Sequence, residues 1–222
     1  MLPFLPLNPL ASDEKVNSET LVEASILIPK HAHHIAGLYE KRSSLTLKDG
    51  TRLTEAGLYT SKSVKAGQLI GLYTGYMIAD AQYRRLPIDV KMALGRYTVS
   101  MHESNMQVSP VNPSSPYEKV DFMRHPLALT NEPAKGMHAN AFVEARAVEM
   151  GDAMFECLCM YACNDIQEHS EILWMYGKAY RRIGYKAGIP CSKESGLEQP
   201  FDMLSNCRSQ PEFEFVAVQL EG

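Results

Sequence analysis

The chain has 222 residues, of which 45% are hydrophobic and 22% are charged, and its formal net charge is -4. This composition is typical of a soluble globular protein with one domain, or at most two small ones. The length allows a buried core that needs no disulfide or metal to hold it together. The small negative charge argues against broad nucleic-acid binding, which needs an excess of Lys and Arg. No apolar run approaches the roughly 20 residues of a membrane span, so we expect neither nucleic acid nor membrane as a partner.

The two ends of the chain are irregular in sequence. Residues 1–17 are rich in proline and then polar, which favours an extended arm, and the opening apolar stretch lacks the basic residues of a signal peptide. Ser18 is a suitable N-cap for a helix that runs through Leu27 and ends before Pro29. The five cysteines are odd in number and scattered, which is typical of reduced thiols, so we expect an intracellular protein, nuclear or cytoplasmic.

From about Leu53 the sequence consists of short apolar segments separated by glycine and turn residues. One short helix is predicted over 79–86, because an acidic residue near its start and two arginines at its end suit the helix dipole. Strands are predicted over 56–60, 68–75, 97–101, 106–108, 142–148, 154–162, 172–176 and 213–218. The sequence therefore predicts a mostly-β domain of many short strands with few short helices.

The predicted strand Ile172 to Tyr176 contains the single tryptophan of the chain. Because side chains alternate along a strand, Trp174 and Tyr176 are expected on the same side, as an aromatic wall beside a phenol. From this fragment alone, an edge strand whose aromatic side chains belong to the core is an equally good interpretation.

Three blocks of sequence stand in a fixed order around this strand. They read EAGLYTSKSVKAGQLIGLYTGYMI, then LTNEPAKGMHANAFVE, and finally ACNDIQEHSEILWMYGKAY. In order and spacing they resemble the opening glycine motif, the Asn-His-Ser segment and the closing tyrosine segment of the SET-domain family. That family comprises protein lysine methyltransferases that use S-adenosylmethionine.

The resemblance implies a SET domain over residues 53–182. An N-terminal extension over 1–52, an arm plus a short helix, and a C-terminal tail over 183–222 flank it. It also implies a pseudoknot-like threading, in which the chain near Tyr176 passes beneath a loop formed around Asn131. The sequence departs from the family's pattern at Glu55, which replaces a glycine, and at Glu132 and Met175, which replace a histidine and an aspartate. These departures fall on positions that shape the cofactor pocket.

By the same resemblance, Tyr176 is the catalytic residue, whose hydroxyl orients the lysine amine beside the transferred methyl group. A buried core tyrosine is the alternative. Trp174 falls where the family lines the channel for the substrate lysine, and its size predicts a restricted methylation state. Tyr97 is a further candidate for the channel wall, although a core tyrosine on a strand is as good an interpretation.

The cofactor expected from the resemblance is S-adenosylmethionine. Asn131 matches the asparagine that contacts its amino-acid end, and an amide that both donates and accepts suits a zwitterion. A turn-forming asparagine is the alternative. Ala56, Gly57 and Leu58 would approach the cofactor through their backbone. Glu132, beside Asn131, and Tyr180, against the adenine, complete the predicted cofactor residues.

No metal site is expected. Cys157, Cys159 and Cys163 suggest a zinc cluster, but the first two alternate on one face of a predicted strand, and Cys191 and Cys207 lack compact zinc spacing. A further histidine-rich segment, 31–34, has no acidic or cysteine neighbours and is interpreted as a solvated loop or helix end.

The function that the resemblance implies is methyl transfer to a lysine side chain of a protein substrate, histone or non-histone. Two other classes of function stay open. One is a catalytically weak SET-fold module that binds a protein partner, favoured by Glu55, Glu132 and Met175 and opposed by Asn131 and Tyr176. The other is a zinc-dependent module.

Overall fold

The computed structural model describes residues 24–29, 37–46, 55–101, 105–122, 125–150, 153–177, 180, 182, 186–191 and 213–218. For 24–29, 147–150, 153–156 and 213–218 it describes the backbone alone. Most of the described elements are strands in small antiparallel sheets, with few and short helices, which confirms the predicted mostly-β class. No helix among the described residues is both long enough and apolar enough to cross a membrane.

The described strands form three sheets. The first has the order β10-β1-β5-β7-β6, the second pairs β2 with β3, and the third has the order β4-β9-β8. The bounds of the strands are β1 Ala24–Pro29, β2 Leu38–Arg42, β3 Ala56–Thr60, β4 Leu69–Tyr73, β5 Tyr76–Ala79, β6 Val99–Met101, β7 Met106–Ser109, β8 Ala141–Met150, β9 Ala153–Ala162 and β10 Phe213–Val218.

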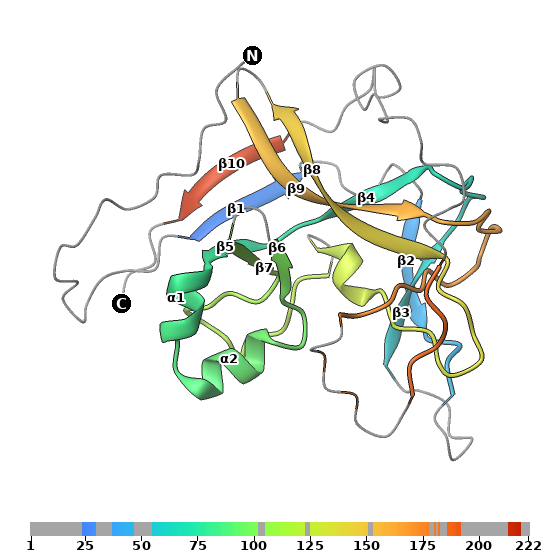
Figure 1. The fold of residues 1–222 in the computed structure, drawn as a ribbon, viewed down its shortest axis with the longest axis horizontal. Helices are drawn as coiled ribbons and strands as arrows, with labels where there is room; N and C mark the ends of the chain where they lie inside the picture. The colour runs from blue at the N-terminus through green and yellow to red at the C-terminus, as the bar shows by residue number, and fades with distance from the viewer. Residues whose placement is uncertain are drawn as a thin grey trace, which may run out of the picture.

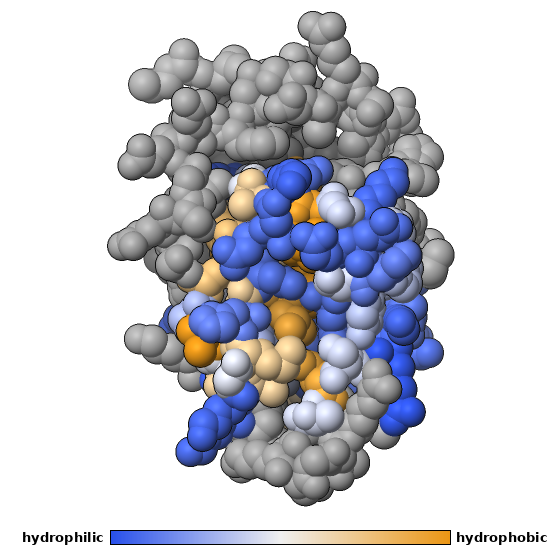
Figure 2. Space-filling model, turned by 90° about the vertical axis from the view of Figure 1, so that its right-hand side faces the viewer, coloured by the Kyte–Doolittle hydropathy of each residue, from blue (hydrophilic) through white to orange (hydrophobic). Residues whose placement is uncertain are grey.

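Two short helices, α1 Asp80–Arg85 and α2 Ile88–Leu94, follow β5, and a 3-10 turn, η1 Pro126–Leu129, precedes the closing half of the domain. Figure 1 shows the long β8–β9 hairpin crossing the molecule, with α1 and α2 toward one end and β2–β3 toward the other. The face at the β2–β3 end is mostly hydrophilic, with a narrow strip of hydrophobic atoms between the polar residues (Figure 2).

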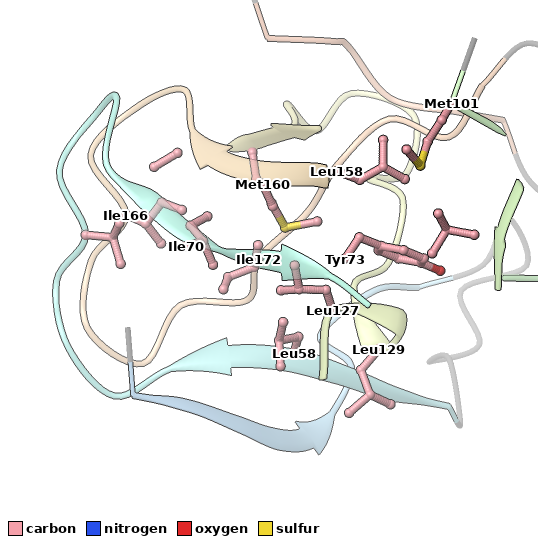
Figure 3. Packing of buried hydrophobic residues seen from close by; sticks show 14 of the residues in the cluster. Leu58, Ile70, Tyr73, Met101, Leu127, Leu129, Leu158, Met160, Ile166 and Ile172 are labelled. Atoms are coloured by element: carbon pink, nitrogen blue, oxygen red, sulfur yellow. The ribbon is translucent and has the colours of Figure 1, made fainter. Parts of the chain in front are cut away.

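The core lies where the second and third sheets meet η1. Leu58 of β3, Ile70 of β4 and Met160 of β9 point toward one another together with Leu127 and Ile172 (Figure 3). Each of these five side chains is at most 2% exposed. Every residue of β4 is buried, so both faces of this strand are covered, as its continuous apolar run requires. Burying one such aliphatic side chain contributes about 1.5–3 kcal/mol to folding.

The segment from Glu171 to Trp174 passes through the centre of the domain. The N–H of Ile172 donates to the carbonyl of Leu58 at 2.8 Å. Further along, isolated parallel bridges join Leu173 to Asn131 and Trp174 to Ala141. Because residues 131 and 141 both flank this one segment, the loop between them crosses it. This is the pseudoknot-like threading that the resemblance implied, and it brings segments far apart in sequence to one place.

Several local predictions were wrong. The helix expected over Ser18–Leu27 is contradicted where the chain is described, because Ala24–Pro29 is a strand. Its β-branched and leucine residues suit a strand, and β10 and β5 pair with its two edges. The helix α2 was not anticipated at all. The remaining part of the predicted helix, the arm 1–17, the segment 31–34 and Cys207 lie outside the described residues.

The strands predicted over 106–108, 142–148 and 154–162 are longer by one to three residues in the structure, and three others differ more. The strand over 68–75 ends at Tyr73, and the chain bends at Gly75, where a Cβ would lie 2.3 Å from the carbonyl oxygen of Ser109. The strand over 97–101 begins only at Val99, because Tyr97 is in the turn that follows α2. Finally, 172–176 is extended but makes isolated bridges rather than a ladder.

Candidate functional site

A pocket of about 820 Å³ opens beside residues 171–180, which we call the closing segment. Five aromatic side chains share its wall: Tyr73, Tyr97, Trp174, Tyr176 and Tyr180. They come from the end of β4, the turn after α2 and the closing segment, so the fold gathers them from distant parts of the sequence. Pockets of this volume are the size that ordinarily holds a small molecule.

Four of these five rings, those of Tyr73, Trp174, Tyr176 and Tyr180, form a connected chain along this wall. Tyr176 lies edge-on to Trp174, with ring centroids 5.7 Å apart, and edge-on to Tyr180 at 4.6 Å. Trp174 in turn lies 6.1 Å from Tyr73. Edge-to-face pairs at these distances are favourable, so each ring helps to fix the orientation of the next.

Two of the phenols have their protons committed to main-chain carbonyls. The hydroxyl of Tyr176 donates to the carbonyl of Thr130 at 2.9 Å. The hydroxyl of Tyr73 donates to the carbonyl of Tyr97, and burial raises the pKa of Tyr73 far above its ordinary value. Burial also raises the pKa of Tyr97, and the nearby Glu55 carboxylate adds to the shift. Tyr73 and Tyr97 are therefore neutral near pH 7, and their hydroxyl groups act as dipoles.

A buried ion pair stands next to Tyr176. The side chain of Glu132 is 1% exposed, and its carboxylate accepts hydrogen bonds from Arg182 Nε at 2.6 Å and Nη2 at 2.5 Å. The same carboxylate accepts the backbone N–H of Tyr176 at 2.8 Å. Arg182 also donates to the carbonyls of Tyr176 and Tyr180 and lies over the ring of Tyr180. The pair therefore fixes the backbone on both sides of the aromatic chain.

A second buried carboxylate, that of Glu171, lies at the beginning of the closing segment. Hydroxyls of Ser43 and Ser44 donate to it at 2.7 and 2.5 Å, and the N–H of Ser44 donates at 2.8 Å. Tyr59 donates at 3.2 Å and Asn131 Nδ2 at 3.1 Å. Burial alone would raise the pKa of Glu171, but the hydrogen bonds from Ser44, Asn131 and Ser43 outweigh it and lower this pKa. We call these five residues the Glu171 cage.

The predicted cofactor residues differ in what they contact. Asn131 Nδ2 donates to the carbonyl of Ala56 at 3.0 Å, so the structure brings these two residues together. The carbonyl of Leu58, however, accepts the N–H of Ile172, and its side chain is in the core. At Gly57 a Cβ would lie 2.2 Å from Glu171 Oε1. Position 57 therefore requires glycine for a reason that does not involve the cofactor: a side chain there would collide with the Glu171 carboxylate.

The predicted channel residues Trp174 and Tyr97 share the pocket wall with Tyr176, the predicted catalytic residue, and with Tyr180, a predicted cofactor residue. The cofactor residues Ala56, Gly57 and Asn131 form a neighbouring group around the Glu171 cage, and Glu132 is linked to Tyr176 by a hydrogen bond. A second asparagine, Asn140, clamps the closing segment: its Nδ2 donates to the carbonyl of Glu171 at 2.9 Å, and its Oδ1 accepts the N–H of Leu173 at 2.8 Å.

Comparison with solved structures gives matches of low sequence identity. A Plasmodium falciparum protein assigned as a histone methyltransferase matches with a TM-score of 0.40 and 20% identity, over 64% of this chain and 95% of that one. The Neurospora SET domain protein DIM-5, a histone lysine methyltransferase, matches with a TM-score of 0.45 and 16% identity, over 67% of this chain and 55% of that one. This chain resembles SET-domain histone methyltransferases.

A third match is the Chaetomium thermophilum Polycomb Repressive Complex 2 in an autoinhibited conformation, bound to S-adenosylmethionine. Its TM-score is 0.43 and its identity 14%, over 66% of this chain and 16% of that one. No family model matches the sequence, and no curated protein matches it. The likeness in these comparisons concerns the fold.

Sequence reasoning missed several residues of the site. Arg182 lies outside the three blocks, and no spacing rule connects it to Glu132 fifty positions earlier. Ser43 and Ser44 precede the first block and reach Glu171 only through the fold. Glu171 itself was detectable, because it occupies the acidic position of the closing block, but its role as an acceptor for five hydrogen bonds was not.

Proposed function

We propose that the protein transfers a methyl group from S-adenosylmethionine to a lysine side chain of a protein substrate. The observation that carries this proposal is the aromatic pocket with the hydroxyl of Tyr176 held at its wall. The methyl group on the sulfonium of S-adenosylmethionine is what the cofactor supplies when bound. The likeness to SET-domain methyltransferases supports the choice of cofactor and of a protein substrate, histone or non-histone.

The residues present suit that cofactor. The pocket volume of about 820 Å³ accommodates a nucleoside-sized ligand together with a lysine side chain. Tyr180 offers a ring for the adenine, and its pKa is raised by burial and by Glu55 and Glu132, which keeps it neutral. Asn131, beside Ala56, offers its amide to the amino-acid end. Glu132 acts on this site through Tyr176 and Arg182 rather than as a ligand contact.

Tyr176 orients the amine and does not serve as a base. Because its proton is donated to the Thr130 carbonyl, the phenol oxygen acts toward the lysine amine as an acceptor of an N–H rather than as a donor. The surrounding rings of Trp174, Tyr73 and Tyr97 exclude water, and their faces favour a cation in the channel. A free lysine titrates at about 10.4, so desolvation among these rings helps it lose its proton before it reacts.

Methyl transfer to a peptide library, followed by mass spectrometry, tests this proposal. We expect wild type to add methyl groups to lysine peptides, and Tyr176→Phe to reduce the turnover rate about 100-fold, the penalty of a poorly oriented reactant. Binding of S-adenosylhomocysteine should be retained in this variant, since the hydroxyl donates to the carbonyl of Thr130, which is not one of the predicted cofactor residues. An unchanged turnover rate in Tyr176→Phe would contradict the assigned role.

A catalytically weak module that binds a protein partner is the second candidate function. The observation that favours it is Glu55, which replaces the glycine of the opening motif and lies close enough to Tyr97 and Tyr180 to raise both pKa values. Glu132, by contrast, no longer argues for it, because Arg182 compensates this departure. A folded wild-type protein that binds S-adenosylhomocysteine no more tightly than adenosine would favour this candidate.

A further inference from the structure

The amide of Asn131 uses both of its N–H donors inside the protein. Nδ2 donates to the carbonyl of Ala56 at 3.0 Å and to Glu171 Oε1 at 3.1 Å. Both partners are acceptors only, the carbonyl always and the carboxylate while it is ionised. Turning the amide over would set Oδ1 against two other oxygens. The orientation of the amide is therefore decided by chemistry as well as by shape.

The remaining atom of the amide, Oδ1, is left as an acceptor. Among the residues that the structure describes, no donor to Oδ1 is recorded, and the side chain of Asn131 is only half-buried. A ligand that meets this side chain thus finds an acceptor and no donor. Polarisation by the carboxylate on the far side of the amide strengthens that acceptor.

Glu171 is built to hold this arrangement. Its second oxygen, Oε2, takes the donors of Ser44 and Tyr59, and Ser43 shares Oε1 with Asn131. The Cα of Gly57 packs against the same carboxylate, where a side chain would collide. An ionised carboxylate held on three sides cannot turn away from Asn131.

We propose that Glu171 is a positioning residue that commits Asn131 to accepting a hydrogen bond, so that the site selects ligands carrying an ammonium group. This inference rests on the proposed function, in which that group is the ammonium of S-adenosylmethionine. A carboxyl group of the ligand would find no donor at Asn131 and must be bound elsewhere. Selectivity for the ammonium is therefore a property of the pair, Glu171 and Asn131, rather than of Asn131 alone.

The test measures two dissociation constants by calorimetry on the full chain. The probes are S-adenosylhomocysteine and its deamino analogue, in which hydrogen replaces the ammonium group. Wild type should bind the first about 10- to 100-fold more tightly, the range for a hydrogen bond to a charged group. In Glu171→Gln the amide at 171 can donate to a reversed Asn131, and the ratio should fall to about twofold.

Val64→Ala is the matched control, because Val64 is a buried core residue and its truncation leaves the Glu171 cage and the Asn131 contacts in place. It should lower the melting temperature but keep the wild-type ratio, which separates positioning from stability. A second measurement covers the case in which Glu171→Gln does not fold. In wild type, both Nδ2 protons of Asn131 should exchange slowly with deuterated water in an NMR experiment, as engaged donors do.

Each other outcome counts against the inference in a distinguishable way. A ratio of the two dissociation constants near one in wild type, or an unchanged ratio in folded Glu171→Gln, would overturn the role of Glu171. Tight binding of S-adenosylhomocysteine in the same experiment would still uphold the proposed function. Fast exchange of either Nδ2 proton in wild type would overturn the role of Glu171 too. Failure of folded wild type to bind either probe would overturn the inference and the proposed function together.

Discussion

Removal of Arg182 should destabilise the protein strongly. The side chain of Glu132 is 1% exposed and that of Arg182 is 20% exposed, so the pair is largely withdrawn from water. In Arg182→Met the carboxylate loses both guanidinium donors and keeps the N–H of Tyr176 at 2.8 Å. Breaking a buried pair by removing one partner costs about 3–5 kcal/mol. Because Arg182 is partly exposed, we expect the lower end, about 3 kcal/mol.

Urea unfolding followed by tryptophan fluorescence measures this loss, since Trp174 lies on the wall that the pair supports. The double variant Glu132→Gln/Arg182→Met provides the control. Without a buried charge to leave unpaired, it should recover about half of the loss or more, so the two substitutions should be strongly non-additive. A loss of less than about 0.5 kcal/mol in the unfolding free energy of Arg182→Met is the size of an ordinary surface change. That result would refute the claim that Arg182 compensates for the buried charge of Glu132.

Three further predictions concern the closing segment. Gly57→Ala should cost about 2 kcal/mol or more in urea unfolding, because its Cβ would meet Glu171 Oε1 at 2.2 Å; a neutral effect would contradict the packing. The lowered pKa of Glu171 predicts a contribution to stability that is full above the unfolded pKa of about 4.3 and is lost as the pH falls through the lower folded value. The stability gap between wild type and Glu171→Gln should therefore shrink from pH 7 to pH 3, and a constant gap would count against it. Trp174→Phe should widen the channel and raise the proportion of higher methylation states in the product, whereas an identical product distribution would remove Trp174 from that role.

The parts of the fold that were predictable from sequence are those whose apolar or charged residues form a local pattern. The long strand β8 follows from its alternation of apolar and charged residues over 143–147, β9 follows from a nearly continuous apolar run, and α1 follows from charges that suit its dipole. The strand Ala24–Pro29 was mistaken for a helix because a short apolar run carries no period of its own. Its partners are β10, far along the chain, and β5, and only their pairing makes the strand favourable.

The site residues likewise fall into those that a local pattern predicts and those that it does not. Trp174 and Tyr176 were placed on one side of an extended segment by alternation, and their rings do lie 5.7 Å apart. The partners of the two buried carboxylates could not be found this way. Arg182 reaches Glu132, and Ser44 reaches Glu171, only because the threaded segment draws distant parts of the chain together. Such contacts follow from topology, which local sequence patterns do not encode.

Titration of wild type with S-adenosylhomocysteine by calorimetry, beside Asn131→Ala, tests the central claim most directly. The account predicts a single site in wild type and a loss of affinity of about tenfold or more in Asn131→Ala, as expected when a hydrogen bond to a charged group is removed. Absence of binding in wild-type protein shown to be folded by circular dichroism would contradict the methyltransferase proposal.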